Sequence, residues 1–259
     1  MSLIITTAGR PDEQSAAFIE QAAVRLQAPV VERKKRSISK MQDIYQSDVL
    51  VAGKDRYSFY KRGSDEPFFF HPNSATYRLR RLQKGEQDPL LEATGLKAGD
   101  SFLDCTLGLG SDAIIAASRV GMEGSVIGVE ADPVISFLTD IGLRSFPIEF
   151  PLLQEAMGRV QVIHSDAIQF LESCPDQSYD VVFLDPMFTT PIEESSNFES
   201  LRDIGVADSL TEEWVTEALR VCRRRVVLKD HFQSPMFERF GFRQQIRLNT
   251  KVHYGVLEK

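Results

Sequence analysis

The sequence predicts an α/β protein in which a doubly wound parallel sheet forms the larger part and a small α/β domain precedes it. Two observations lead to this prediction. From residue 100 onward, short apolar runs alternate with helical stretches, and strands that alternate with helices build parallel sheets through right-handed crossovers. Before residue 74, the chain instead shows a strand, a helix and a hairpin pattern of its own. A length of 259 residues allows one large domain, or a medium domain with a smaller partner.

Residues 1–73 are predicted to form the small domain, because β-branched and apolar runs there lie on both sides of one long segment with helical periodicity. Its predicted elements, in chain order, are a strand at 3–7, a helix at 12–27, a short helix near 37–46, a hairpin at 49–61 turned at Lys54-Asp55, and a buried strand end or loop at 68–73. Residues 74–99 are predicted as a connector that begins with a basic helix at 74–84. We expect the small domain to serve substrate recognition.

Residues 100–259 carry the alternation that predicts a large, seven-stranded sheet. Its strands are expected, in chain order, at 101–108, 125–133, 160–166, 179–188 and 224–230, with a closing antiparallel hairpin formed by 242–249 and 251–258. The helices between them are expected at 112–121, 134–146, 167–173 and 211–222. Ligands bind such sheets at the carboxyl ends of the strands, so the motifs at these ends are the candidates for function.

Composition and cysteine usage limit the class of protein. The chain is 42% hydrophobic and 26% charged, which excludes collagen-like, coiled-coil and wholly disordered proteins. No apolar run approaches the roughly 18 residues that span a bilayer, and the N-terminus lacks the pattern of a secretion signal. Cys105, Cys174 and Cys222 lie far apart without a CxxC pair, so we expect neither disulfides nor a metal site. A cytoplasmic protein without a membrane or metal partner is therefore expected.

Charge is distributed unevenly along the chain, although the net charge is −7. Residues 1–100 carry 16 Lys+Arg against 13 Asp+Glu, whereas residues 101–259 carry 14 against 24. The positive charge is concentrated in two clusters, Arg33, Lys34, Lys35, Arg36 and Lys40, and then Arg78, Arg80, Arg81 and Lys84. Such clusters contact phosphates in nucleic-acid-binding proteins, but basic helices are also commonly solvated faces.

A glycine-rich loop follows the first strand of the larger part. Gly108 and Gly110 let the backbone approach a ligand without a Cβ clash, and the next helix offers its N-terminal N–H groups to an anion. Glu130 ends the second strand beside this loop, where a carboxylate can accept both hydroxyls of a ribose. The spacing Gly108-x-Gly110-x-x-Ala113 also fits a dinucleotide fingerprint, so NAD and S-adenosylmethionine both stay open on this loop alone. Asp166, after the third strand, could cap a helix or accept from an adenine amine.

The fourth strand ends in Asp185-Pro186-Met187-Phe188, which closely resembles the [DN]PP[YF] loop of class I methyltransferases that alkylate exocyclic amines of bases. An aryl amine is a poor nucleophile because its lone pair is delocalised into the ring. The Asp185 carboxylate and the Pro186 carbonyl can hold its hydrogens and direct the lone pair at a methyl sulfonium, while Phe188 stacks on the flipped base.

Together these segments resemble S-adenosylmethionine-dependent methyltransferases over residues 100–259, with the closest likeness to the RsmJ-type family, which methylates guanine N2 in small-subunit ribosomal RNA. The shared pattern is visible as Asp104, Thr106, Gly108, Gly110, Asp112, Ala113, Glu130 and 185–188. The resemblance implies a Rossmann-like class I methyltransferase sheet with S-adenosylmethionine as cofactor. It implies cofactor contacts from Asp104, Gly108, Gly110, Asp112, Glu130, Ala131 and Asp166, and catalytic roles for Asp185, Pro186 and Phe188.

The expected function is methyl transfer to an exocyclic base amine, with guanine N2 of small-subunit rRNA as the leading target and RNA or a 30S particle as the partner. Substrate contacts are expected from His71, Arg78, Arg80, Arg81, Lys229, Lys251 and His253. One alternative is an adenine-N6 methyltransferase on RNA or DNA. The others are an NAD-dependent oxidoreductase, which leaves 185–188 unexplained, and a non-catalytic RNA-binding assembly factor, which an intact Asp185 loop disfavours.

Overall fold

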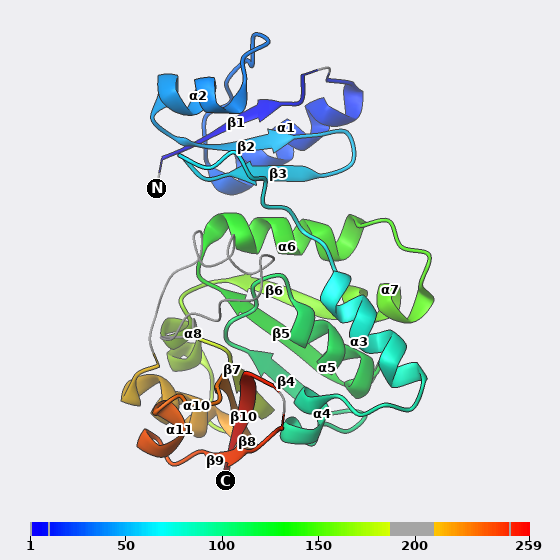
Figure 1. The fold of residues 1–259 in the computed structure, drawn as a ribbon, viewed down its shortest axis with the longest axis vertical. Coiled ribbons are helices and arrows are strands. Elements are labelled where there is room, and N and C mark those ends of the chain that lie inside the picture. Colours follow the sequence, from blue (N-terminus) through cyan, green and yellow to red (C-terminus); the bar gives the residue numbers. More distant parts are fainter. Residues whose placement is uncertain (1, 10, 187–209, 249) are drawn as a thin grey trace.

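A computed structural model of the chain describes residues 2–9, 11–186, 210–248 and 250–259. Figure 1 shows a smaller part, which holds the N-terminus, set against a larger part that holds the C-terminus. The smaller part contains a three-stranded sheet and the larger part a seven-stranded one. The α/β prediction and its Rossmann-like sheet are therefore confirmed.

The smaller part is built from β1 (Leu3–Thr7), α1 (Glu13–Leu26), α2 (Ile38–Tyr45), β2 (Asp48–Ala52) and β3 (Tyr57–Tyr60). Strand β1 pairs parallel with β2, and β2 pairs antiparallel with β3. Helix α1 begins where it does because Asp12 accepts a hydrogen bond from the backbone of Ser15, while the Ser15 side chain returns the contact. The strand, both helices and the hairpin expected here are all present, and the FFFHPN segment contributes a bridge between Phe68 and Phe59.

The seven strands of the larger sheet lie in the order β6-β5-β4-β7-β8-β10-β9. They are β4 (Ser101–Asp104), β5 (Ser125–Glu130), β6 (Val160–His164), β7 (Tyr179–Leu184), β8 (Cys222–His231), β9 (Arg243–Gln245) and β10 (Val252–Glu258). Strands β4 to β8 pair in parallel, and β10 pairs antiparallel with β8 and β9, as the predicted closing hairpin requires. The strand order reverses at β4, and the crevice outside such a reversal is where open α/β sheets bind ligands.

Helices cover both faces of this sheet, which explains why its strands are nearly continuous apolar runs. They are α3 (Asn73–Gln83), α4 (Pro89–Thr94), α5 (Ser111–Val120), α6 (Pro133–Ser145), α7 (Pro151–Gly158), α8 (Ala167–Ser173), α10 (Glu212–Val221) and α11 (Met236–Arg239). Helices α3, α5, α6 and α7 lie in one apolar cluster, and α8, α10 and α11 lie in another. In the described chain, no helix combines the length and apolar character needed to cross a membrane.

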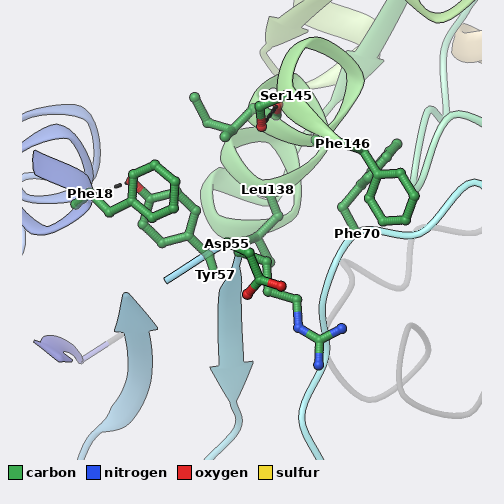
Figure 2. Close-up of a pocket in the computed structure, with 10 residues that line it drawn as sticks. Phe18, Asp55, Tyr57, Phe70, Leu138, Ser145 and Phe146 are labelled. Atoms are coloured by element: carbon green, nitrogen blue, oxygen red, sulfur yellow. Dashed lines mark hydrogen bonds between the residues drawn. The ribbon is translucent and has the colours of Figure 1, made fainter. Parts of the chain in front are cut away.

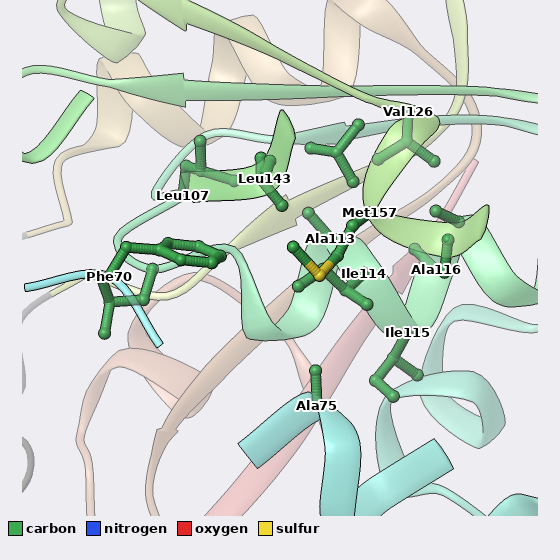
Figure 3. Packing of buried hydrophobic residues seen from close by; sticks show 14 of the residues in the cluster. Phe70, Ala75, Leu107, Ala113, Ile114, Ile115, Ala116, Val126, Leu143 and Met157 are labelled. Atoms are coloured by element: carbon green, nitrogen blue, oxygen red, sulfur yellow. The ribbon is translucent and has the colours of Figure 1, made fainter. Parts of the chain in front are cut away.

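Helices α3 and α4, which lie in the segment expected to act as a connector, pack directly on the large sheet. Ala75 and Leu79 of α3 are fully buried, and Ala75 faces Ile114 and Ile115 of α5 (Figure 3). Helix α4 contacts α5 and strands β8 and β10. Residues 73–94 thus belong to the apolar core of the larger part.

The two parts meet on helix α6. The rings of Tyr57 and Phe137 lie edge to face with their centroids 4.9 Å apart, and Figure 2 shows Phe18, Tyr57 and Phe70 gathered around this helix. Phe70 packs so closely on Gly142 that a Cβ atom there would overlap its ring. Glycine is therefore required at this position of α6 for the present contact between the two parts.

Candidate active site

The glycine loop joins β4 to α5 in a conformation that its glycines permit. Gly108 and Gly110 have φ values of 52° and 73°, in the left-handed region that residues with a Cβ adopt only at a cost. Leu107 donates its backbone N–H to the Val129 carbonyl at 2.9 Å, which ties the loop to β5. The loop therefore leaves the sheet directly at the reversal point and runs into the N-terminus of α5.

Glu130, the last residue of β5, holds this loop. Its Oε2 accepts the backbone N–H of Gly108 at 2.9 Å, and its Oε1 accepts that of Asp132 at 2.9 Å. Each carboxylate oxygen has a further lone pair, so both can still accept a hydroxyl. Burial raises the pKa of Glu130 above its ordinary value, while the two N–H donors favour the ionised form. The carboxylate thus lies beside the glycine loop, where an acceptor for the ribose hydroxyls is expected.

Glu130→Ala is expected to weaken S-adenosylmethionine binding by about 2–4 kcal/mol, because two hydrogen bonds to a charged acceptor are lost. The Gly108 N–H also loses its partner, so the loop itself loosens. Titration calorimetry measures the effect, with Glu130→Gln as the matched variant that keeps one acceptor oxygen. Unchanged affinity in a folded Ala variant would remove Glu130 from the cofactor site.

Residues after β5 and β6 complete this side of the site. The Asp166 carboxylate accepts the backbone N–H of Gln169 at 2.9 Å and so caps α8, which is the structural role that the sequence left open. The Ala131 carbonyl lies 3.2 Å from Nε2 of His164. Ala131 and Asp166 are both half-buried at the carboxyl edge of the sheet, and their cofactor roles stay predictions.

Asp185 follows β7 on the other side of the glycine loop, and two contacts fix it. Its backbone N–H donates to Oγ1 of Thr106 at 2.8 Å, and Nζ of Lys229 lies 2.6 Å from its Oδ2. Thr106 in turn donates its backbone N–H to Asp104 at 3.0 Å. The cofactor loop and the predicted catalytic carboxylate are thereby joined through one threonine. Phe188, which was predicted to stack on the base, lies outside the described residues.

Lys229 and Arg78 connect Asp185 to the rest of the molecule in a buried chain of ion pairs. Lys229 bridges Asp185 and Asp112, with 2.9 Å between its Nζ and Oδ2 of Asp112. Arg78 bridges Asp112 at 2.6 Å and Asp88, which accepts from two of its nitrogens at 2.8 Å. The series of ion pairs thus begins on Asp88, before α4, continues through α3 and α5, and ends at Asp185 at the carboxyl edge of the sheet.

The protonation states along this chain follow from burial and from the neighbouring charges. Burial opposes ionisation of Asp112, but Lys229 and Arg78 outweigh it and hold the pKa of Asp112 well below its usual value. Burial and the negative Asp112 raise the pKa of Asp185 to about 6, although Lys229 opposes them. Asp104 has no cationic partner at hydrogen-bond distance among the described residues, and burial raises its pKa to about 8.

Asp104→Asn is expected to stabilise the cofactor-free protein at neutral pH. The side chain is 1% exposed, and its pKa is raised from 3.8 to about 8, so the folded state keeps a proton that the unfolded state releases. The wild-type protein therefore loses stability as the pH rises from about 4 to about 8, whereas the Asp104→Asn variant does not. We expect Asp104→Asn to melt on the order of 5 °C above the wild-type protein at pH 8, and at nearly the same temperature as the wild type at pH 4. Equal differences in melting temperature at pH 4 and pH 8 would contradict the raised pKa assigned to Asp104.

The predicted substrate contacts fall into two groups in the structure. Arg78 and Lys229 were expected to face RNA, but their side chains are only 18% exposed and pair with internal carboxylates. His253 is likewise buried, where its ring contacts Gln244 and the Arg247 carbonyl at 2.9 and 3.0 Å. For these three residues the structure supports an internal role, because a second partner would first have to displace the present ones.

The remaining substrate candidates lie at or near the surface. Arg80 and Arg81 are exposed, and Arg81 pairs with Glu86 at 2.5 Å. His71 lies edge to face with Phe69, and burial lowers its pKa. Lys251 is exposed beside the start of β10. Sequence reasoning did not single out Asp88, whose motif Asp-Pro-Leu-Leu signals only a helix cap.

The carboxylates at this edge suit a cofactor with cationic groups. Asp88, Asp112 and Asp185 share one lysine and one arginine, which leaves negative charge in excess even though Asp104 keeps its proton at neutral pH. An S-adenosylmethionine molecule presents a sulfonium and an ammonium, whereas the pyrophosphate of NAD would meet Asp112 in the first turn of α5. The described residues contain no group of three or more His, Cys, Asp or Glu side chains placed to bind a metal.

The sheet order, the glycine loop and the acidic residues at the ends of β5 and β7 define a class I S-adenosylmethionine-dependent methyltransferase. A family model described as "Putative SAM-dependent methyltransferase" matches residues 41–253, and the chain belongs to this family. Its cofactor is therefore S-adenosylmethionine, and the NAD-dependent alternative is wrong. The resemblance to the RsmJ type is confirmed.

Three known proteins illustrate the relationship. The uncharacterized protein YpiP of Bacillus subtilis (strain 168) is 44% identical over 98% of this chain and 99% of its own length. Ribosomal RNA small subunit methyltransferase J of Shewanella amazonensis is 31% identical over 69% of this chain and 72% of its own length. The crystal structure of the SAM-dependent methyltransferase NGO1261 from Neisseria gonorrhoeae superposes with a TM-score of 0.61 and 18% identity, covering 98% of this chain and 95% of that one, and shares the fold.

Proposed function

We propose that this methyltransferase transfers the methyl group to an exocyclic amine of a nucleobase, with guanine N2 of small-subunit rRNA as the target. The observation that carries the proposal is the position of Asp185. It ends β7 beside the cofactor loop, Thr106 fixes its backbone, and Lys229 holds Oδ2 of its carboxylate. That arrangement leaves lone pairs on the carboxylate for the N–H of an incoming amine.

The reaction requires little from the protein beyond orienting the amine toward the methyl group. Bound S-adenosylmethionine would supply a methyl group on a sulfonium, held by the glycine loop and Glu130. The Asp185 carboxylate and the Pro186 carbonyl accept the two hydrogens of the amine, which aligns its lone pair for attack. The methylated nitrogen then loses its proton readily, so no strong base is required. This assignment needs Asp185 ionised, and a pKa of about 6 leaves it mainly so at neutral pH.

The rRNA target rests on the relatives and not on the amine chemistry, since adenine N6 would need the same two acceptors. Several relatives carry the name Ribosomal RNA small subunit methyltransferase J, and the methyltransferase family model matches residues 41–253, a range that contains Asp185. A folded ribosomal target also suits a protein of net charge −7, because RNA shape and packed ribosomal protein can share the recognition. Ribosomal subunits are the expected partner, which would place the enzyme in the cytoplasm.

The test is to incubate the purified protein and labelled cofactor with 30S particles, naked small-subunit rRNA and duplex DNA, and then to identify the labelled nucleoside. N2-methylguanosine on the ribosomal substrates is the expected product. Label in N6-methyladenine, or on DNA alone, would overturn the target while keeping the amine chemistry. RNA binding without turnover on any substrate would favour the assembly-factor alternative.

A further inference from the structure

An exposed apolar and basic surface lies at the end of β8 and in the connection between β9 and β10. Phe232, Ile246 and Leu248 are 40%, 79% and 86% exposed, and the last two are among the most exposed large apolar residues of the described chain. The half-buried Arg247 lies between the two aliphatic residues, and the exposed Lys251 follows on the same connection. We call these five residues the hairpin surface.

Phe232 is held rigidly within this surface. Its backbone N–H donates to the Lys251 carbonyl at 2.9 Å, and its carbonyl accepts from the Gln244 side chain at 2.7 Å. Its ring lies against His231 and His253, with centroids 4.6 and 5.9 Å away. The buried His253 is itself fixed by Gln244, so the exposed face of Phe232 is preorganised.

The hairpin surface lies at the same edge of the sheet as the proposed amine site. Strands β7 and β8 are parallel with Leu184 opposite Leu228, so Asp185, which follows β7, lies level with Lys229 within β8. Phe232 follows Lys229 by three residues, or about 10 Å of extended chain. A nucleic acid that presents a base to Asp185 would therefore pass within reach of Phe232.

We propose that the hairpin surface binds the unpaired nucleotides that flank the target base, with Phe232 stacking on one of them and Arg247 and Lys251 lying near phosphates. This inference rests on the proposed function, because it takes RNA as the substrate. Single-stranded RNA is recognised by aromatic side chains that stack on splayed bases and by cations that follow the backbone. The hairpin surface offers both chemistries together, on residues outside the predicted cofactor contacts.

The test measures binding of a ten-nucleotide single-stranded RNA of mixed sequence by fluorescence anisotropy. Phe232→Ala is expected to weaken binding about 5- to 150-fold, the equivalent of about 1–3 kcal/mol for one stacked base. Phe232→Trp keeps the ring and should bind within about threefold of wild type. Ile44→Ala removes another exposed apolar side chain, on α2 of the smaller part, and should change nothing. Arg247→Ala should reduce the salt slope by about 0.7.

Cofactor affinity should be the same in all four variants, which shows that each is folded. Unchanged RNA affinity in Phe232→Ala would overturn the proposal, and so would a change in self-association without a change in RNA binding, since that result assigns the surface to a second copy of the chain. Failure of the proposed function is a separate result. It would be seen as absence of methyl transfer by the wild-type protein, whereas the binding assay needs no turnover.

Discussion

Asp185→Asn should abolish most methyl transfer, by about 10²–10⁴-fold, while S-adenosylmethionine binds within about threefold of wild type. The substitution keeps the shape of the side chain and the backbone contact with Thr106. It replaces one acceptor oxygen by an N–H donor and removes the charge that we propose to orient the amine. Because Glu130 and the glycine loop are untouched, the loss should fall on turnover and not on cofactor affinity.

Equilibrium dialysis with labelled cofactor and a methyl-transfer assay separate these two effects. Asp176→Asn serves as the control, since Asp176 is an exposed carboxylate paired with Arg220. Turnover at the wild-type rate in Asp185→Asn would end the amine-orienting role. A parallel loss of cofactor binding would instead place Asp185 in the cofactor site.

Lys229→Met should have the largest effect on stability, because it leaves Asp185 and part of the Asp112 charge buried without compensation. Removing one partner of a buried pair costs about 3–5 kcal/mol, and Lys229 serves two carboxylates. Lys229→Arg keeps the charge and should lose much less. Urea denaturation of both variants at pH 7 measures the difference, and equal stability of Lys229→Met and wild type would show that the ion pairs contribute nothing.

The same substitution should move the pH dependence of methyl transfer. In the proposed function the ionised form of Asp185 is the acceptor, and its raised pKa of about 6 then means that the wild-type rate falls as the pH drops through 6. Loss of the nearby positive charge raises this pKa further, by about 1–3 units. The acidic limb of the rate profile should therefore shift upward in Lys229→Met and stay in place in Lys229→Arg. An unshifted limb would show that Asp185 does not govern the profile.

The sequence was sufficient to predict the sheet and the position of the motifs, for a local reason. Each motif directly follows a strand, and parallel strands end at one edge, so Gly108, Glu130 and Asp185 had to come together once the strands were recognised. The short helices α4, α7 and α11 were missed. Two of them begin at a proline after irregular chain, and none is long enough to show a clear helical period.

The role of Arg78 shows what the sequence could not supply. It stands three residues after Ala75 and four before Leu82, on the side of α3 that faces the core, whereas its cluster of basic neighbours suggested a contact with RNA phosphates or a solvated face. Its true partners, Asp88 and Asp112, are 10 and 34 residues away. Only the fold brings these carboxylates to one guanidinium, and no local spacing encodes such a contact.

The packing of α3 has a consequence for how such a protein can be divided and recombined. Arg78 and Asp88 precede residue 100 yet belong to the ion-pair chain that reaches Asp185. Dividing the polypeptide at residue 100 would remove two of the four ion pairs in this series, whereas dividing it before Asn73 would keep all of them. A different leading domain joined ahead of α3 would therefore leave these ion pairs in place, but it would have to cover the face of α6 on which Tyr57 and Phe70 now pack.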